Sequence, residues 1–227
     1  MTIKECAEAL DLANSTVHKH LATGKQTRLV VQEGTEYRLG LGFLTYGVAV
    51  QKLFPIYELT QDVMDNLADE TGERIWLKVE ENGREIPIEN VAGEQAIQTD
   101  RDIGGPNKMH KTAGGKAILA FLDAERRREI LADMELDANT DNTITDREKL
   151  EAELEQIRDE GVAYNKSEDI AGVNAVGAPI IDNDGNVHGS LVIAGPEHRL
   201  DDERLENELA NLVKGTTNEV GINISYR

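Results

Sequence analysis

Apolar positions near the start of the chain repeat with the period of two short helices. The first helical face is formed by Ile3, Cys6, Ala7 and Leu10. After a break, a second helix is expected to begin at Asn14 or Ser15, because a short polar side chain can accept hydrogen bonds from the free N–H groups of a helix start. Its inward residues are Val17 and Leu21, and Gly24 is expected to end it early. Two short helices joined by a tight turn form the helix-turn-helix pattern.

Two β-rich runs follow the second helix. They lie within residues 28–39 and flank Gly34, which predicts a hairpin, and a hairpin directly after a helix-turn-helix indicates a winged helix. We therefore assign residues 1–40 to a winged helix-turn-helix. Residues 41–53 are expected to form a linker helix that ends near Pro55.

The remaining region, residues 54–227, mixes helical and strand patterns without an internal repeat. Helical spacing covers 56–67, 117–122, 124–136, 146–161 and 201–220, and strand patterns cover 74–79, 85–91, 162–165, 175–181 and 187–194. Two connections between strands are short turns, at Asn82-Gly83 and at 182–185, so the strands that they join must be antiparallel. The sequence therefore predicts an α+β domain in which helices pack on a largely antiparallel sheet.

The acidic charge of the chain is confined to the larger region. The 227 residues carry a formal charge of −19, whereas residues 1–50 hold five basic and five acidic side chains and are neutral. Because carboxylates repel DNA phosphates, the neutral segment is the one suited to DNA. An acidic surface also indicates adaptation to high salt, which screens charge repulsion, so we expect a halophilic source. The alternative is an acidic protein from a low-salt organism.

Several protein classes are disfavoured by the residues that the sequence lacks. No run of about 18 apolar residues is present, which argues against a membrane span. The first residues do not form the apolar stretch of a signal peptide, so a cytoplasmic protein is expected. The single cysteine, Cys6, excludes an internal disulfide and a cysteine-based metal site, and we expect it to be a small buried side chain. Since the five histidines are scattered, we predict no metal, no cofactor and no catalytic residues.

A glycine-rich segment at 104–116 runs into the helix predicted at 117–122. A nucleotide-binding P-loop would require glycine where the chain has His110 and serine or threonine where it has Ala117, so we exclude nucleotide hydrolysis. Backbone N–H groups at a helix start can still hold an anion such as a carboxylate. The alternative for this segment is a flexible connecting loop. Glu168 and Asp169, between two predicted strands, either line a pocket or are solvated.

In this order and spacing, the segments resemble the IclR family of transcription regulators along nearly the whole chain. Residues 14–21 resemble the recognition helix of that family, and residues 36–40 resemble the exit of its wing. In the larger region, 109–120 is similar to the family's His-x-x-Ala-x-Gly-Lys-Ala segment. The series continues at 160–164, 168–172, 177–180 and 193–199.

The resemblance implies a regulator that binds an operator in double-stranded DNA and a small effector. A GAF-like domain over 54–227 would bind an organic, sugar or aromatic acid and would form a homodimer or homotetramer. We predict DNA contacts at Ser15, Thr16, His18, Lys19, His20, Lys25, Arg28, Thr35 and Tyr37. We predict effector contacts at Met109, Ala113, Gly114, Asn165, Glu168, Ala175, Val192 and Ala194.

Two departures from the family pattern leave alternatives open. The family has a further helix before the one that starts at Ile3, so we expect a truncated N-terminus and an exposed apolar face over 3–10. Residues 23–28 also replace the usual end of the recognition helix. A stand-alone small-molecule sensor with a degraded DNA-binding module is therefore the alternative to a DNA-binding regulator. An enzyme that acts on a small acid is a third hypothesis, which the lack of a catalytic set disfavours.

Overall fold

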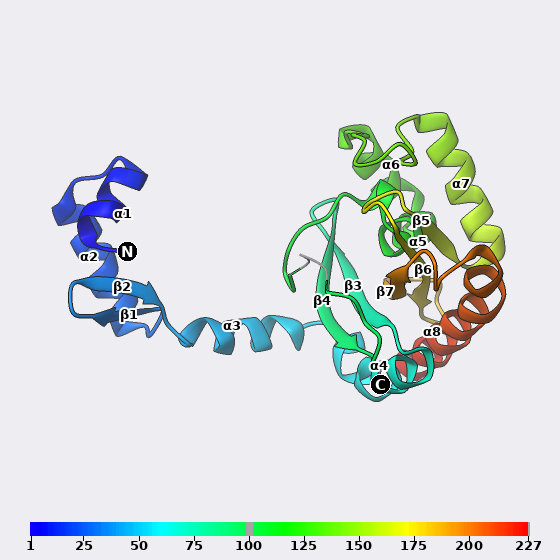
Figure 1. Ribbon diagram of the computed structural model, residues 1–227, viewed down its shortest axis with the longest axis horizontal. Coiled ribbons are helices and arrows are strands. Elements are labelled where there is room, and N and C mark those ends of the chain that lie inside the picture. The colour runs from blue at the N-terminus through cyan, green and yellow to red at the C-terminus, as the bar shows by residue number, and fades with distance from the viewer. Residues whose placement is uncertain (99–101, 227) are drawn as a thin grey trace. The chain divides into compact units, whose positions relative to one another are not determined.

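The computed structural model describes residues 1–98 and 102–226, and the chain divides into two compact units, Met1–Phe54 and Pro55–Arg227 (Figure 1). In the described part of the chain, no helix is both long enough and apolar enough to cross a membrane.

The N-terminal unit has the predicted order of two helices, a hairpin and a further helix. These are α1 (Ile3–Leu10), α2 (Asn14–Gln26), β1 (Val30–Glu33), β2 (Glu36–Leu39) and α3 (Gly42–Gln51). A capping box starts α1, in which the hydroxyl of Thr2 accepts from the backbone N–H of Glu5 and the Glu5 carboxylate accepts from the N–H of Thr2. The chain start also pairs with the wing, since the backbone N–H of Tyr37 donates to the carbonyl of Met1 at 2.7 Å.

Both sequence predictions for the ends of α2 are wrong. The residue that caps its start is Ala13, which offers no side-chain hydrogen bond, so neither Asn14 nor Ser15 is the cap. The helix also continues through Gly24 to Gln26. A Cβ at position 24 would lie 2.7 Å from a methyl group of Val30, so glycine is needed here because β1 packs closely against the helix and not because the helix ends.

The larger unit is built on a five-stranded sheet in the order β4-β3-β7-β6-β5, with every neighbouring pair antiparallel. The strands are β3 (Arg74–Glu81), β4 (Arg84–Ala92), β5 (Ala163–Lys166), β6 (Val173–Ile181) and β7 (Val187–Pro196). The predicted α+β fold with an antiparallel sheet is confirmed. One irregularity matters for the site: Ile88 is an extra residue in β4 with no opposite residue in β3. Because this bulge changes the alternation of β4, Glu85 and Pro87 face the same side of the sheet as Lys78.

Helices cover both faces of this sheet. The helical segments of the larger unit are α4 (Pro55–Thr71), η1 (Met109–Lys111), α5 (Ala113–Phe121), α6 (Ala124–Asp133), α7 (Arg147–Glu160), the π-helical segment η2 (Arg204–Leu209) and α8 (Ala210–Ile224). One face is packed by α4 and α8, whereas the other is packed by α5, against which α7 lies (Figure 1). As predicted, Asp146 caps the start of α7 and Gly161 ends it in the left-handed conformation.

The start of α5 differs from the prediction of a helix beginning at Ala117. The helix begins at Ala113, because the Thr112 hydroxyl accepts from the backbone N–H of Gly115 at 3.1 Å and so caps it. Gly114 and Gly115 therefore lie in the first turn of the helix and not in a loop. A Cβ on Gly114 would lie within 3 Å of Lys78 and of two residues of β7, so this glycine brings α5 close to the sheet.

Candidate functional site

A small cavity lies where the start of α5 faces the sheet. Its volume is about 60 Å³, room for a few water molecules. Apolar side chains of four strands, β3, β4, β6 and β7, form much of its wall. Its polar side chains come from β3, β5, the loop after β5 and the segment that leads into α5. The lining residues are Trp76, Lys78, Pro87, Asn107, Thr112, Ala113, Asn165, Asp169, Ile170, Val173, Ala175, Val192 and Ala194.

Strand register gathers five of the eight predicted effector contacts around this cavity. Asn165 of β5 lies opposite Ala175 of β6, and Ala175 lies opposite Ala194 of β7, so the three form one row across the sheet. Val192 lies two residues from Ala194 on the same face, and Ala113 closes the row from the start of α5. The sequence prediction placed these residues in one site, and the strand register together with the start of α5 is what brings them close in space.

The other three predicted contacts do not line the cavity. Met109 is fully buried in a separate apolar cluster with residues of α5, α6 and α7. Gly114 touches Lys78 and Val192, which do line the cavity. Glu168 faces a different hollow, beside α7, and its carboxylate accepts hydrogen bonds from Lys116 at 2.7 and 2.9 Å.

Charged and hydroxyl groups that the sequence reasoning missed form a chain beside the cavity. The ammonium of Lys78 lies 2.5 Å from one carboxylate oxygen of Glu85, whose side chain is fully buried. The other Glu85 oxygen accepts from the hydroxyl of Thr112, the same hydroxyl that caps α5. Strand alternation places Trp76 and Lys78 on one face, but the sequence alone does not say which face meets α5.

A second buried lysine supports the loop that forms one side of the cavity. Lys116 in α5 is fully buried, and its ammonium lies 2.5 Å from Glu153 and 2.7 Å from Glu168. Burial raises the pKa of the Glu168 carboxyl, although the charge of Lys116 opposes that shift. The backbone of Glu168 precedes Asp169 and Ile170, so the Lys116 ion pairs hold the loop that presents those two residues to the cavity.

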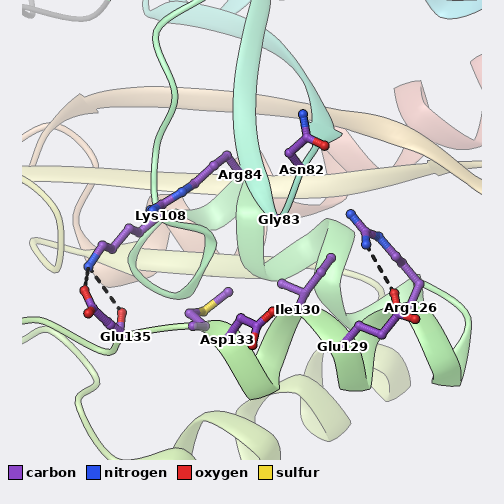
Figure 2. A pocket seen from close by; sticks show the side chains of 10 residues that line it. Asn82, Gly83, Arg84, Lys108, Arg126, Glu129, Ile130, Asp133 and Glu135 are labelled. Carbon is purple, nitrogen blue, oxygen red and sulfur yellow. Dashed lines mark hydrogen bonds and ion pairs between the residues drawn. The ribbon is translucent and has the colours of Figure 1, made fainter.

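A larger hollow of about 650 Å³ lies between the turn joining β3 to β4 and helix α6 (Figure 2). Figure 2 shows charged side chains along it, and several pair with each other: Arg126 bonds to Glu129 at 3.3 Å, and Lys108 to Glu135 at 3.4 Å. Because these pairs lie at the surface and already satisfy one another, we take the smaller cavity as the candidate effector site.

The predicted DNA contacts lie on the exposed side of the N-terminal unit. Ser15, His18, Lys19 and His20 are exposed on α2, whereas Thr16 is half-buried. In the hairpin, Thr35 is exposed and Tyr37 is half-buried. A groove between the end of α2 and the hairpin is lined by Lys25, Arg28 and Arg38, of which Arg38 was not predicted. This surface therefore combines a polar helix face with three cationic side chains, a composition suited to phosphates.

A family model described as the C-terminal domain of the bacterial transcriptional regulator IclR matches residues 48–221 of this chain. The chain belongs to the IclR family. Members of this family are transcription regulators and not enzymes, so the predicted family and the predicted lack of an enzymatic role are confirmed.

Relatives of known name support this assignment over the whole chain. The probable HTH-type transcriptional regulator ArcR of Halobacterium salinarum is 30% identical over 99% of this chain and 87% of its own length. The crystal structure of Thermotoga maritima IclR has a TM-score of 0.87 and 29% identity, and covers 100% of this chain and 92% of that one. An IclR homolog from Microbacterium hydrocarbonoxydans, complexed with 4-hydroxybenzoate, has a TM-score of 0.84 at 18% identity, over 97% of this chain and 90% of that one, which shows a shared fold.

Proposed function

We propose that this protein is a sequence-specific DNA-binding transcription regulator controlled by a small acid. Residues 1–40 bind the operator, residues 41–53 form a linker helix, and residues 54–227 bind the effector and oligomerise. The observation that carries the proposal is the cavity at the start of α5. It occurs in a chain that belongs to a family of regulators and that begins with a helix-turn-helix and a hairpin.

The DNA part of the proposal rests on the exposed face of α2. Ser15, His18 and Lys19 follow one another at helical spacing on that face, and such side chains can reach phosphates and base edges in the major groove. Lys25 and Arg28 border the groove beside the hairpin and would contact the DNA backbone. This unit lacks the large negative charge of the remaining chain, so it would meet DNA with little repulsion.

The effector part rests on the mixed lining of the cavity. Alanines at 113, 175 and 194 leave space beside Trp76, whose indole is almost fully buried. The cavity as it stands has room for a few water molecules, so an aromatic or short aliphatic body would enter it as its walls move apart. A related fold has been crystallised with 4-hydroxybenzoate. We therefore favour a small organic or aromatic acid among the predicted ligand classes.

The linker helix supports a homodimer or homotetramer. Helix α3 is rich in apolar residues, yet Phe43, Leu44, Tyr46, Val48 and Val50 are all at least 47% exposed. A helix of this composition is normally buried, and a second copy of the chain would bury it. A symmetric dimer would also present two recognition helices to the two halves of an operator.

The acidic larger unit fits a protein that works in concentrated salt, as expected for the cytoplasm of a halophile. A halophilic archaeon is also the source of ArcR. Since salt screens repulsion among the carboxylates, the melting temperature should rise from low salt to multimolar potassium chloride. An unchanged melting temperature would contradict this adaptation.

DNA binding by the full chain tests the proposal directly. Genomic fragments from the source organism are selected for binding, and affinities for a selected site and a scrambled site are compared. Lys19→Ala should weaken binding to the selected site, and His18→Ala should cost about 1–3 kcal/mol of discrimination between bases. Lys4→Ala is the matched control, because Lys4 is an exposed lysine on α1. If no sequence is preferred and the chain still binds acids, the protein is a stand-alone sensor.

A further inference from the structure

Lys78 is the one basic side chain among the described residues that line the cavity. Its side chain is only 11% exposed, and it comes from β3, which lies between β4 and β7 in the sheet. An ammonium group has three N–H donors, and the only hydrogen bond that the described residues accept from it is the one to Glu85. Two donors therefore have no acceptor among the described residues and could turn to a ligand in the cavity.

Glu85 is held in place on its other side. Its second oxygen accepts from the hydroxyl of Thr112, so the carboxylate joins Lys78 to the capped start of α5. Without a ligand, the pair of Lys78 and Glu85 is neutral, which is how a buried lysine is normally tolerated. A carboxylate that entered the cavity would be attracted by Lys78 and repelled by Glu85.

We propose that the effector is a monocarboxylic acid with an apolar body, that Lys78 binds its carboxylate, and that Glu85 limits how tightly it binds. This inference rests on the proposed effector cavity and adds the residue that selects the ligand class. Its basis is a nearly buried lysine that lines a cavity with largely apolar walls and whose ammonium bonds to one carboxylate among the described residues.

The end of the cavity that lies away from Lys78 is the reason why we expect a ligand with one carboxylate and not two. Asp169 comes from the loop after β5, which is separated from β3 in the sheet by β6 and β7. Its carboxylate lies 3.9 Å from Lys111 and accepts a hydrogen bond from Asn139 at 3.2 Å. A second carboxylate on the ligand would approach Asp169, whereas an apolar group would contact Ile170, Val173 and the alanines.

The role of Lys78 is tested by comparing acids with their neutral amides. Dissociation constants of the full chain are measured by calorimetry in concentrated potassium chloride for benzoate and benzamide, for isovalerate and isovaleramide, and for the dicarboxylate phthalate. The wild type should bind at least one of the two monocarboxylic acids at least tenfold more tightly than its amide, and more tightly than phthalate. This comparison requires no substitution and so does not depend on the folding of a variant.

Substitutions then assign the preference to one side chain. Lys78→Met should weaken binding of the acid at least tenfold and leave binding of the amide within about twofold. Glu85→Gln should tighten binding of the acid several-fold, because it removes the competing charge and keeps an acceptor for Thr112. Lys78→Arg should retain the preference for the acid. Lys108→Met is the matched control, because that lysine is also paired with a carboxylate at 2.5 Å but lies outside the cavity.

Three results would overturn the inference. They are a wild type that binds the amide as tightly as the acid, a folded Lys78→Met variant that keeps its affinity for the acid, and a wild type that binds no acid or amide of the set. If the chain still binds an operator selectively in any of these cases, the proposed role as a DNA-binding regulator is retained. Failure of the inference is therefore distinguishable from failure of the proposed function.

Discussion

The two units of this protein differ in how they bury apolar side chains. In the larger unit, both faces of the sheet are covered, and side chains such as Met64, Leu77 and Leu191 are fully buried. In the N-terminal unit, the buried apolar side chains are only those of Ala7 and Val17, among the residues that the structure describes. Of the fourteen exposed large apolar side chains in the described chain, eleven lie before Pro55. One unit thus has a complete core of its own, whereas the other leaves most of its large apolar side chains exposed, as a surface that binds a partner would.

The largest expected difference between the two units is the loss of stability when a leucine is replaced by alanine. Leu191→Ala should lower the free energy of unfolding of the larger unit by about 4 kcal/mol, because it opens a cavity in a fully buried core. Leu44→Ala, on a side chain that is 65% exposed, should leave that unfolding transition unchanged and weaken self-association. Urea unfolding and analytical ultracentrifugation measure the two effects. A large loss of stability from Leu44→Ala alone would contradict the comparison.

A buried ion pair of the larger unit should contribute more to the free energy of unfolding than an exposed ion pair of the N-terminal unit. Arg199 donates two hydrogen bonds, of 2.8 and 2.7 Å, to the fully buried carboxylate of Glu73. Arg199→Met should cost about 2 kcal/mol, because the buried Glu73 carboxylate loses two charge-assisted hydrogen bonds and keeps the guanidinium of Arg204 at 3.8 Å. Arg38 pairs with Glu33 at 2.6 Å on the exposed hairpin, so Arg38→Met should cost less than about 1 kcal/mol. Equal losses in urea unfolding would mean that burial does not decide the strength of these pairs.

The smallest expected effect is a dependence of the free energy of unfolding on pH, caused by His110. Burial lowers the pKa of the His110 side chain, and the nearby charge of Lys111 acts in the same direction. Below about pH 6.5, the unfolded chain therefore takes up a proton that the folded chain resists, and stability falls as the pH drops from 7 to 5. The loss is at most about 1.4 kcal/mol per pH unit.

Replacing His110 with glutamine should reduce the pH dependence of unfolding in this range. The matched control is His18→Gln, which replaces an exposed histidine of α2 by glutamine as well. An identical pH profile for wild type and His110→Gln would show that His110 does not contribute.

Features with local causes could be predicted from the sequence. Asn82 and Gly83 both have positive φ, as the tight turn between β3 and β4 requires, and Asp146 and Gly161 mark the ends of α7 as expected. The antiparallel sheet followed from such turns. Each of these features depends on residues within a few positions of one another, so the chain reveals them without knowledge of its tertiary contacts.

Features with distant causes could not be predicted. The bulge at Ile88 and the pairing of Lys78 with Glu85 arise from packing between elements. The true start of α5 depends on Thr112, whose hydroxyl bonds both to the helix and to Glu85. The resemblance to a family named five residues that line the cavity, and Asp169 was one of two residues offered for a pocket. Lys78, Asn107 and Thr112 could not be assigned to the cavity until the packing of the elements was known.

Lys116 provides a built-in reporter for chemical footprinting. Its amine is fully buried between Glu153 and Glu168, whereas Lys4 has a side chain that is 80% exposed. Amine-reactive reagents should therefore modify Lys4 rapidly and Lys116 only when α5 separates from α7 and the loop at Glu168. The protein is labelled while folded and then digested, and mass spectrometry of the peptides gives the rate at which Lys116 acquires label. That rate would measure how often this part of the domain opens, and slower labelling with a bound acid would reveal tightening around the cavity.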